Sequence, residues 1–295
     1  MDTRLPIIEN ALDGSGGCGV APPGDEKSRR SRERKRLPKW FKTSLPVGES
    51  QVRYNETKSR VNENSLNTVC EEARCPNVHD CWGRGTATFM IAGEVCTRGC
   101  RFCAIDTSKR PPPLNPDEPR SLADAVSRMG LSHAVITVVN RDDLPDGGAS
   151  HYRDCINSIH EKSPDVGLEL LCSDLDGDKE SLALLLEGLP LNVFAHNVEC
   201  VPRLDPLVRD PRASFKQSIS ILSEAKRIRP DILTKSSIMV GLGETDDEIS
   251  DAMKELRSAG VDMITLGQSL QPGDRLLAVD RFPEPSSFAE WDREA

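Results

Sequence analysis

Six cysteines within 34 residues form two groups of three, the residue type and spacing in this chain best suited to chemistry. Four and five residues separate the cysteines of the first group, and three and two separate those of the second. Thiolates are soft ligands that select zinc, Cu(I) and iron–sulfur clusters over hard cations. The two spacings therefore predict two metal sites of different design, with the ligands Cys70, Cys75 and Cys81 in one and Cys96, Cys100 and Cys103 in the other.

Each group supplies only three sulfurs, and the nearest imidazole, His79, lies inside the first loop. A structural zinc site normally closes with four Cys or His ligands, and a cubane iron–sulfur cluster is usually held by four cysteines. Three ligands leave one position open for a reactive molecule, which favours chemistry. A pair of zinc knuckles remains the structural alternative. Disulfides are disfavoured because ten cysteines in 295 residues are too dilute for a stapled scaffold and no secretory signal is visible.

The elements that must position these cysteines follow an alternating pattern. Short apolar runs rich in β-branched residues alternate with longer amphipathic stretches, which is typical of βα units on a parallel sheet. Six strands are predicted at 87–92, 133–138, 166–172, 191–195, 232–240 and 263–266, and helices at 121–129, 149–162, 179–188, 212–228 and 245–259. The pattern predicts an α/β fold, a partial (β/α)6 TIM-type barrel with an N-terminal cysteine-rich extension.

Barrel enzymes place their chemistry at the carboxyl ends of the strands. The second cysteine group follows the first predicted strand, and polar residues follow the others, at 140–143, 173–174, 196–197, 241–243 and 268. Each of these alone would be ordinary turn chemistry, so only their joint placement predicts a site. The five histidines form no metal-like i, i+4 set, and among them only His196 is predicted to contact a substrate or cofactor. The other four cysteines, Cys18, Cys155, Cys172 and Cys200, are predicted to be buried small hydrophobes.

The segment from Cys96 to Cys103, CTRGCRFC, resembles the signature of the radical S-adenosylmethionine (SAM) enzymes. The first cysteine group narrows the resemblance to the lipoyl synthase family. Further stretches similar to that family are NRDDL at 140–144, HNVE at 196–199, KSSIMVGLGET at 235–245 and LGQ at 266–268. The resemblance runs from about residue 36 to about residue 285.

This resemblance implies that the second group holds a 4Fe-4S cluster whose open iron binds SAM. One electron then cleaves SAM reductively, and the resulting radical removes hydrogen from an unactivated carbon. Phe102, Asn140 and His196 are the expected cofactor contacts, although Phe102 could equally cap the barrel core. The first group is expected to hold an auxiliary 4Fe-4S cluster that is consumed as the sulfur donor.

The implied reaction inserts sulfur at the sixth and eighth carbons of an octanoyl chain on a lipoyl carrier domain. Such domains occur in subunits of 2-oxoacid dehydrogenases and in the glycine cleavage carrier protein, and ferredoxin or flavodoxin would supply electrons. The family usually ends in an Arg-Ser-Ser-Tyr-like motif whose serine ligates the auxiliary cluster, whereas this sequence ends at Ala295 without it. A C-terminally shortened barrel and uncertain sulfur insertion are therefore expected. The alternatives are another radical SAM enzyme with an auxiliary cluster, or a non-catalytic zinc-binding protein.

Composition and charge indicate which partners, domains and location the chain is expected to have. The net charge of −9 disfavours general nucleic-acid binding, and the longest apolar runs fall short of the roughly 20 residues that cross a bilayer. Residues 1–50 are predicted to be a flexible basic arm, 51–85 the cysteine-rich extension and 86–295 the barrel. The arm carries nine basic residues and one acid between Lys27 and Lys42, which would suit an acidic carrier domain. Acids at Asp2, Glu9 and Asp13 speak against organellar import, so a bacterial-type cytoplasm is expected.

Overall fold

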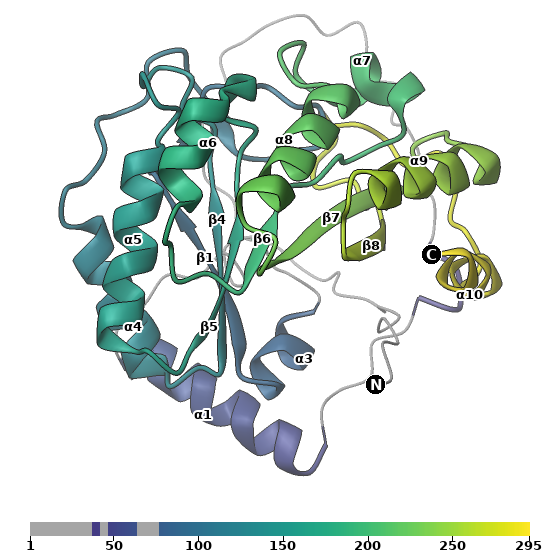
Figure 1. The fold of residues 1–295 in the computed structure, drawn as a ribbon. Coiled ribbons are helices and arrows are strands. Elements are labelled where there is room, and N and C mark those ends of the chain that lie inside the picture. Colours follow the sequence, from purple (N-terminus) through teal and green to yellow (C-terminus); the bar gives the residue numbers. More distant parts are fainter. Residues whose placement is uncertain (1–36, 42–46, 64–76) are drawn as a thin grey trace, which may run out of the picture.

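The computed structural model describes residues 37–41, 47–63 and 77–295, and a six-stranded parallel sheet forms its centre (Figure 1). Neighbouring strands in the sheet also follow one another in the chain. The order is β1 (Thr86–Ile91), β4 (His133–Val138), β5 (Gly167–Leu171), β6 (Val193–Ala195), β7 (Leu233–Val240) and β8 (Met263–Gln268). The six strands predicted from the sequence are confirmed, each within two residues at either end, and so is the α/β partial barrel.

Helices connect successive strands and cover the outer face of the sheet (Figure 1). They are α4 (Glu118–Met129), α5 (Ala149–Lys162), α6 (Lys179–Leu186), α8 (Phe215–Ile228) and α9 (Asp246–Ser258). Alternate strand residues, such as Ala134 and Ile136 of β4, are fully buried beneath them. The facing side of α5 buries Tyr152, Cys155, Ile156 and Ile159, which have the three- and four-residue spacing of an amphipathic helix.

Local sequence signals explain where some of these helices begin. The Thr245 side chain accepts a hydrogen bond from the Glu248 N–H, and the Glu248 carboxylate accepts one from the Thr245 N–H at 2.8 Å. This reciprocal pair is a capping box, which Thr followed three residues later by Glu forms at the start of a helix. By contrast, α8 begins at Phe215 rather than at Arg212, because Ser214 is its N-cap and accepts from the Gln217 N–H.

Elements outside the predicted set flank the barrel. They are α1 (Glu49–Glu63), α3 (Val78–Gly83), α7 (Asp205–Val208), α10 (Pro285–Glu294) and the two short strands β2 (Val95–Cys96) and β3 (Asp106–Thr107). The helices α1 and α3 precede β1. The last helix, α10, buries Trp291. Among the described residues, no helix combines the length and the apolar character needed to cross a membrane. The division into arm, extension and barrel stays a prediction.

Three polar side chains meet between neighbouring strands toward the amino-terminal end of the sheet. Glu169 of β5 accepts a hydrogen bond from Lys235 Nζ of β7 at 2.8 Å, and His133 Nε2 of β4 lies 3.6 Å from its other oxygen. Glu169 is buried and alternates along β5 with Leu168 and Leu170, which are also buried. Because successive side chains of a strand point to opposite faces, Glu169 lies on the inner face of the barrel. That face is therefore polar at this end.

The burial of α6 predicts a large difference between two neighbouring leucines. Leu182 is fully buried, whereas Leu184 is 48% exposed. Leu182→Ala should lower the free energy of unfolding by about 2–5 kcal/mol, and Leu184→Ala should change it by less than about 0.5 kcal/mol. Urea denaturation of both variants beside the parent chain measures the difference. Equal losses would show that α6 does not pack on the sheet through the Leu182 side.

Candidate functional site

The second cysteine group lies on a segment that leaves the carboxyl end of β1. The strands β2 and β3 pair in parallel at the ends of this segment, with Cys96 opposite Thr107. The Ser108 N–H also donates to the Cys96 carbonyl at 3.0 Å. The pairing closes the segment into a loop that carries three half-buried sulfurs, those of Cys96, Cys100 and Cys103.

Backbone N–H groups point at the sulfurs of this loop. The Arg98 N–H donates to Cys96 Sγ and the Asp210 N–H donates to Cys100 Sγ, each at 3.4 Å. The Ile105 N–H makes a corresponding bond to Cys103 and lowers the pKa of that thiol, although burial, the larger effect, raises it. Hydrogen bonds to sulfur stabilise thiolate ligands and help to set the potential of an iron–sulfur cluster. The donor set and its surroundings therefore fit a 4Fe-4S cluster.

Arg98, between the first two cysteines of the loop, is a buried cation that binds two carboxylates of the site. Its guanidinium binds Asp142 through Nε and Nη2, at 3.0 and 2.7 Å, and donates from Nη1 to Asp174 at 2.6 Å. The side chains of Arg98 and Asp174 are only 3% and 1% exposed. Burial alone would raise the pKa of Asp142, but hydrogen bonds from Arg98 and Thr97 outweigh it and hold the pKa below its usual range. The carboxyl ends of β4 and β5 are thus tied to the cysteine loop.

A second arginine also binds the loop. Arg212 donates to the Thr97 carbonyl at 2.6 Å, to Asp210 at 2.9 Å and to Asp142 at 3.1 Å. Asp210 in turn accepts from the Gly99 N–H at 2.9 Å. Because these residues precede α8, the segment between β6 and α8 holds the loop in place.

The first residue of the loop has a strained backbone. Ala92 has φ of 67°, which L-residues other than glycine rarely adopt. Its N–H donates to Glu118 Oε2 at 2.9 Å, and its carbonyl accepts from Arg141 Nη1 at 3.1 Å. Bonds on both sides of the residue therefore hold the turn by which the loop leaves β1.

A pocket of about 480 Å³ opens beside the loop. Its size falls in the range of small-molecule sites. Its lining is polar and carries both signs of charge, from Thr97, Gly99, Thr107, Ser108, Lys109, Asp142, Asp143 and Arg212. The pocket gives a small polar ligand access to the side of the cysteine loop.

The three residues predicted as cofactor contacts have different surroundings. Asn140 is half-buried, and its carbonyl accepts from the Thr97 N–H and hydroxyl at 3.0 and 2.9 Å. Phe102 is partly buried against the core, which matches the expected alternative that it caps the barrel. Their cofactor contacts stay predictions.

His196 is buried, and both of its ring nitrogens are occupied by the protein. Nδ1 bonds the Cys172 carbonyl at 2.9 Å and Nε2 bonds the Ser218 hydroxyl at 2.8 Å. Contact with a cofactor would require one of these bonds to open, so we expect His196 to position β6 and α8 rather than to touch a ligand.

Only one cysteine of the first group lies within the described residues. Cys81 is on α3, before the amino end of β1, whereas Cys70 and Cys75 fall outside the described ranges, as does Cys18. The second group follows the carboxyl end of the same strand. Since a strand rises about 3.3 Å per residue, the six residues of β1 separate its two ends by about 20 Å. The predicted burial of Cys155, Cys172 and Cys200 is confirmed.

Sequence reasoning missed Arg98, Asp210 and Arg212. The sequence did offer a signal for Arg98. Its loop is next to the strand ends that carry Asp142 and Asp174, and a buried arginine needs carboxylate partners of this kind. Asp210 and Arg212 offered no comparable signal, since the prediction placed Arg212 inside a helix.

Comparison with known proteins agrees with this site. The radical SAM superfamily matches residues 90–267, and the N-terminal domain of lipoyl synthase matches residues 21–75. The mitochondrial lipoyl synthase of Branchiostoma floridae is 47% identical over 274 residues, which are 91% of this chain and 72% of the relative. The lipoyl synthase of Halorhodospira halophila is 51% identical over 255 residues, which are 86% of this chain and 75% of the relative.

The chain belongs to the lipoyl synthase family. It is therefore a sulfur-inserting enzyme of the radical SAM type, and a 4Fe-4S cluster and SAM are the cofactors of that superfamily.

Solved structures share the fold. Methylornithine synthase superposes with a TM-score of 0.55 and 13% identity, over 83% of this chain and 73% of its own. Streptococcus suis SuiB bound to S-adenosylmethionine gives a TM-score of 0.52 and 7% identity, over 85% and 62%. At these identities the likeness shows the fold of this lipoyl synthase family member, a partial barrel.

Removing the buried guanidinium should disable the cysteine loop. Arg98→Met leaves Asp142 and Asp174 without their cation, and breaking a buried ion pair costs about 3–5 kcal/mol. We expect the variant to lose most of the iron bound by the second cysteine group after anaerobic reconstitution. Arg101→Met, an exposed arginine of the same loop, is the control and should load iron as the parent does. Iron analysis with electron paramagnetic resonance decides, and full loading of Arg98→Met would contradict the assignment.

The buried His196 should make stability depend on pH. Burial lowers its pKa from 6.5 to about 4, so the ring stays neutral in the folded chain while the unfolded chain takes up a proton. The free energy of unfolding should therefore fall as pH falls below about 6.5, by about 2 kcal/mol between pH 7 and pH 5. His196→Gln should lack this part of the pH dependence. Urea unfolding at both pH values compares the two chains, and identical slopes would rule out a neutral buried imidazole.

Proposed function

We propose that Cys96, Cys100 and Cys103 are the three protein ligands of the catalytic 4Fe-4S cluster of this family. The observation that carries the proposal is the loop itself, in which three half-buried sulfurs each face a backbone N–H. With SAM bound, such a cluster would supply the electron for reductive cleavage of SAM, and so the radical that removes hydrogen from the octanoyl chain.

The residues around the loop have positioning roles in this proposal. Arg98 neutralises Asp142 and Asp174 and fixes the path between Cys96 and Cys100. Arg212 and Asp210 also hold Thr97 and Gly99. Rigid support of this kind keeps reacting groups in productive geometry, where misplacement by about 1 Å can cost about 100-fold in rate.

We further propose that Cys70, Cys75 and Cys81 hold an auxiliary 4Fe-4S cluster, the source of the inserted sulfur. Cys81 precedes β1 and the catalytic loop follows it, so the two sites would lie toward opposite ends of the barrel. An octanoyl chain bound inside the barrel would then be open to hydrogen removal at one end and to sulfur addition at the other. The polar side chains of Glu169, Lys235 and His133 lie toward the end where sulfur would be added.

The substrate class that follows from the family is an octanoylated lipoyl carrier domain. We propose the carrier domains of 2-oxoacid dehydrogenases and of the glycine cleavage system as partners, with ferredoxin or flavodoxin as the electron donor. An acidic carrier would be attracted by the basic residues between Lys27 and Lys42, most of which lie outside the described ranges. The cytoplasmic location stays a prediction.

A single assay separates the two cluster proposals. Reconstituted protein is incubated with SAM, a reductant and an octanoyl-lysyl peptide, and 5′-deoxyadenosine and sulfur-containing peptide are measured by mass spectrometry. Cys100→Ala should abolish both products, because the catalytic cluster loses a ligand. Cys81→Ala should still form 5′-deoxyadenosine but insert no sulfur.

Cys172→Ala is the matched control. Cys172 is buried and belongs to neither cysteine group, so the variant should still form both products. Sulfur insertion by Cys81→Ala at the parental rate would overturn the auxiliary assignment. 5′-Deoxyadenosine from Cys100→Ala would overturn the catalytic one.

A further inference from the structure

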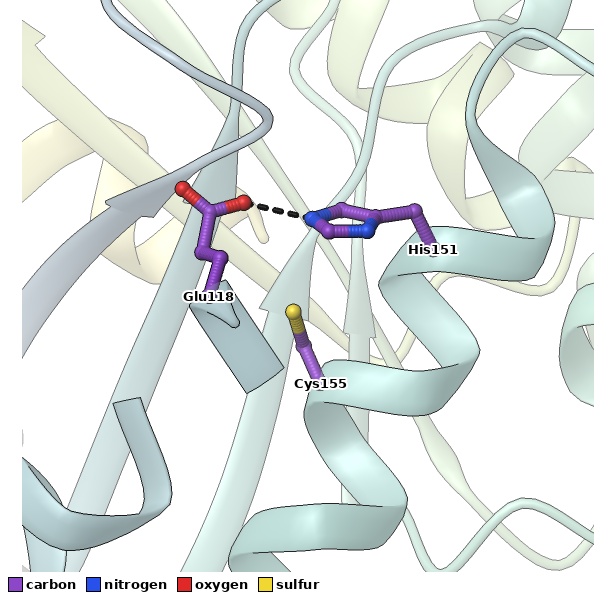
Figure 2. Close-up of side chains that lie close together, drawn as sticks. All are labelled: Glu118, His151 and Cys155. Atoms are coloured by element: carbon purple, nitrogen blue, oxygen red, sulfur yellow. Dashed lines mark hydrogen bonds and ion pairs between the residues drawn. The ribbon is translucent and has the colours of Figure 1, made fainter. Parts of the chain in front are cut away.

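Three side chains of different chemistry meet between α4 and α5, away from the six cysteines considered above. Glu118, His151 and Cys155 each place one potential ligand atom within 4.8 Å of the other two. His151 Nε2 lies 2.5 Å from Glu118 Oε2. Figure 2 shows the Cys155 sulfur pointing toward the gap between the carboxylate and the imidazole.

The helices bring these groups together for simple geometric reasons. His151 and Cys155 are four residues apart on α5, so they lie on one face of that helix. Glu118 is the first residue of α4, the helix that faces them. No two histidines of the sequence have this four-residue spacing. The pair His151 and Cys155 becomes a candidate metal site because Glu118 of α4 lies beside it.

Burial makes this a defined site rather than a group of surface side chains. Cys155 is fully buried, and the His151 side chain is 10% exposed. The Glu118 side chain is 21% exposed, so the carboxylate gives an ion a path from solvent. Since Cys155 and His151 are buried and Glu118 is partly exposed, a cation can reach the site without unfolding of the chain.

The surrounding charge favours a cation. Burial raises the pKa of the Cys155 thiol well above its ordinary value, and the charges of Glu118 and Asp154 raise it further. Arg141 also interacts electrostatically with Glu118, but its guanidinium is committed to Asp143 at 2.8 Å and to the Ala92 carbonyl. A divalent ion would neutralise the carboxylate and the thiolate together.

We propose that Glu118, His151 and Cys155 bind a zinc ion, with water at the fourth position. Zinc accepts sulfur, imidazole nitrogen and carboxylate oxygen in one tetrahedral site, and three protein ligands with an open position are a known zinc arrangement. Binding releases the proton of the Cys155 thiol, because a cysteine binds zinc as the thiolate, and the imidazole binds through a ring nitrogen that carries no proton. The imidazole and carboxylate then exchange their hydrogen bond for bonds to the metal.

The site contacts the catalytic loop through Glu118. Glu118 Oε2 also accepts from the Ala92 N–H at 2.9 Å. Zinc would therefore brace α4 and α5 against the residue at which the cysteine loop leaves β1. The proposal does not depend on which cluster the loop holds.

The test uses the full chain with its clusters reconstituted, equilibrated anaerobically with one equivalent of zinc and desalted. Zinc is counted by mass spectrometry, and its ligands are determined by X-ray absorption at the zinc edge. We expect about one zinc per chain, with one sulfur at about 2.3 Å and the remaining ligands nitrogen or oxygen at about 2.0–2.2 Å.

Variants assign the ligands. Cys155→Ala and Glu118→Gln should each weaken zinc binding at least tenfold, and the glutamine can still accept the Ala92 N–H. Cys200→Ala is the matched control. Cys200 is also buried, and its sulfur also lies near a carboxylate, that of Asp205 at 3.7 Å, but it is not part of the Glu118, His151 and Cys155 group. Its zinc affinity should equal that of the parent. Iron content reports whether each variant is folded.

Three results would overturn the proposal. The first is a parent chain that retains no zinc, which would leave the three residues as a hydrogen-bonded pair beside a buried thiol. The second is zinc with three or more sulfur ligands, which would place it on cluster cysteines. The third is parental affinity in both Cys155→Ala and Glu118→Gln.

Discussion

The functional rim depends on one buried cation. Arg98 lies inside the cysteine loop, and its guanidinium neutralises Asp142 after β4 and Asp174 after β5. A buried charge is tolerated only when it is paired and hydrogen-bonded, so the loop can occupy this position only when both strands present their carboxylates. Arg212, in the segment before α8, also joins the loop to Asp142, because it binds that carboxylate and the Thr97 carbonyl. The planar, bidentate geometry of arginine suits this use better than the point charge of lysine.

The barrel supplies a frame in which such pairing is possible. Six parallel strands in sequential order bring six loops to one rim, as expected for this architecture. Helices bury the outer face, while Glu169 and Lys235 keep the inner face polar at the other end. The outer face thereby packs against helices, while the candidate site lies at the carboxyl ends of the same strands.

Hydrophobic periodicity was sufficient to predict this frame. The strand at His133–Val138 and the helix at Ala149–Lys162 match their predicted bounds, because the strand is a short apolar run rich in β-branched residues and the helix carries apolar residues at three- and four-residue spacing. The helix α1 was missed because most of its residues are polar; Tyr54 and Thr57 are the buried ones among residues 49–59, whose burial the structure describes. The six cysteines were evident from spacing, but the partners of Arg98 lie 44 and 76 residues away, and no local pattern specifies such pairs.

The strained backbone at Ala92 has a consequence for the cysteine loop. The bonds that hold it come from Glu118, 26 residues later, and Arg141, 49 residues later. Neither partner is in place until α4 has docked and β4 has paired with β1. The geometry of the cysteine loop therefore depends on the first two βα units being folded, because residues from both units hold the turn at which the loop begins.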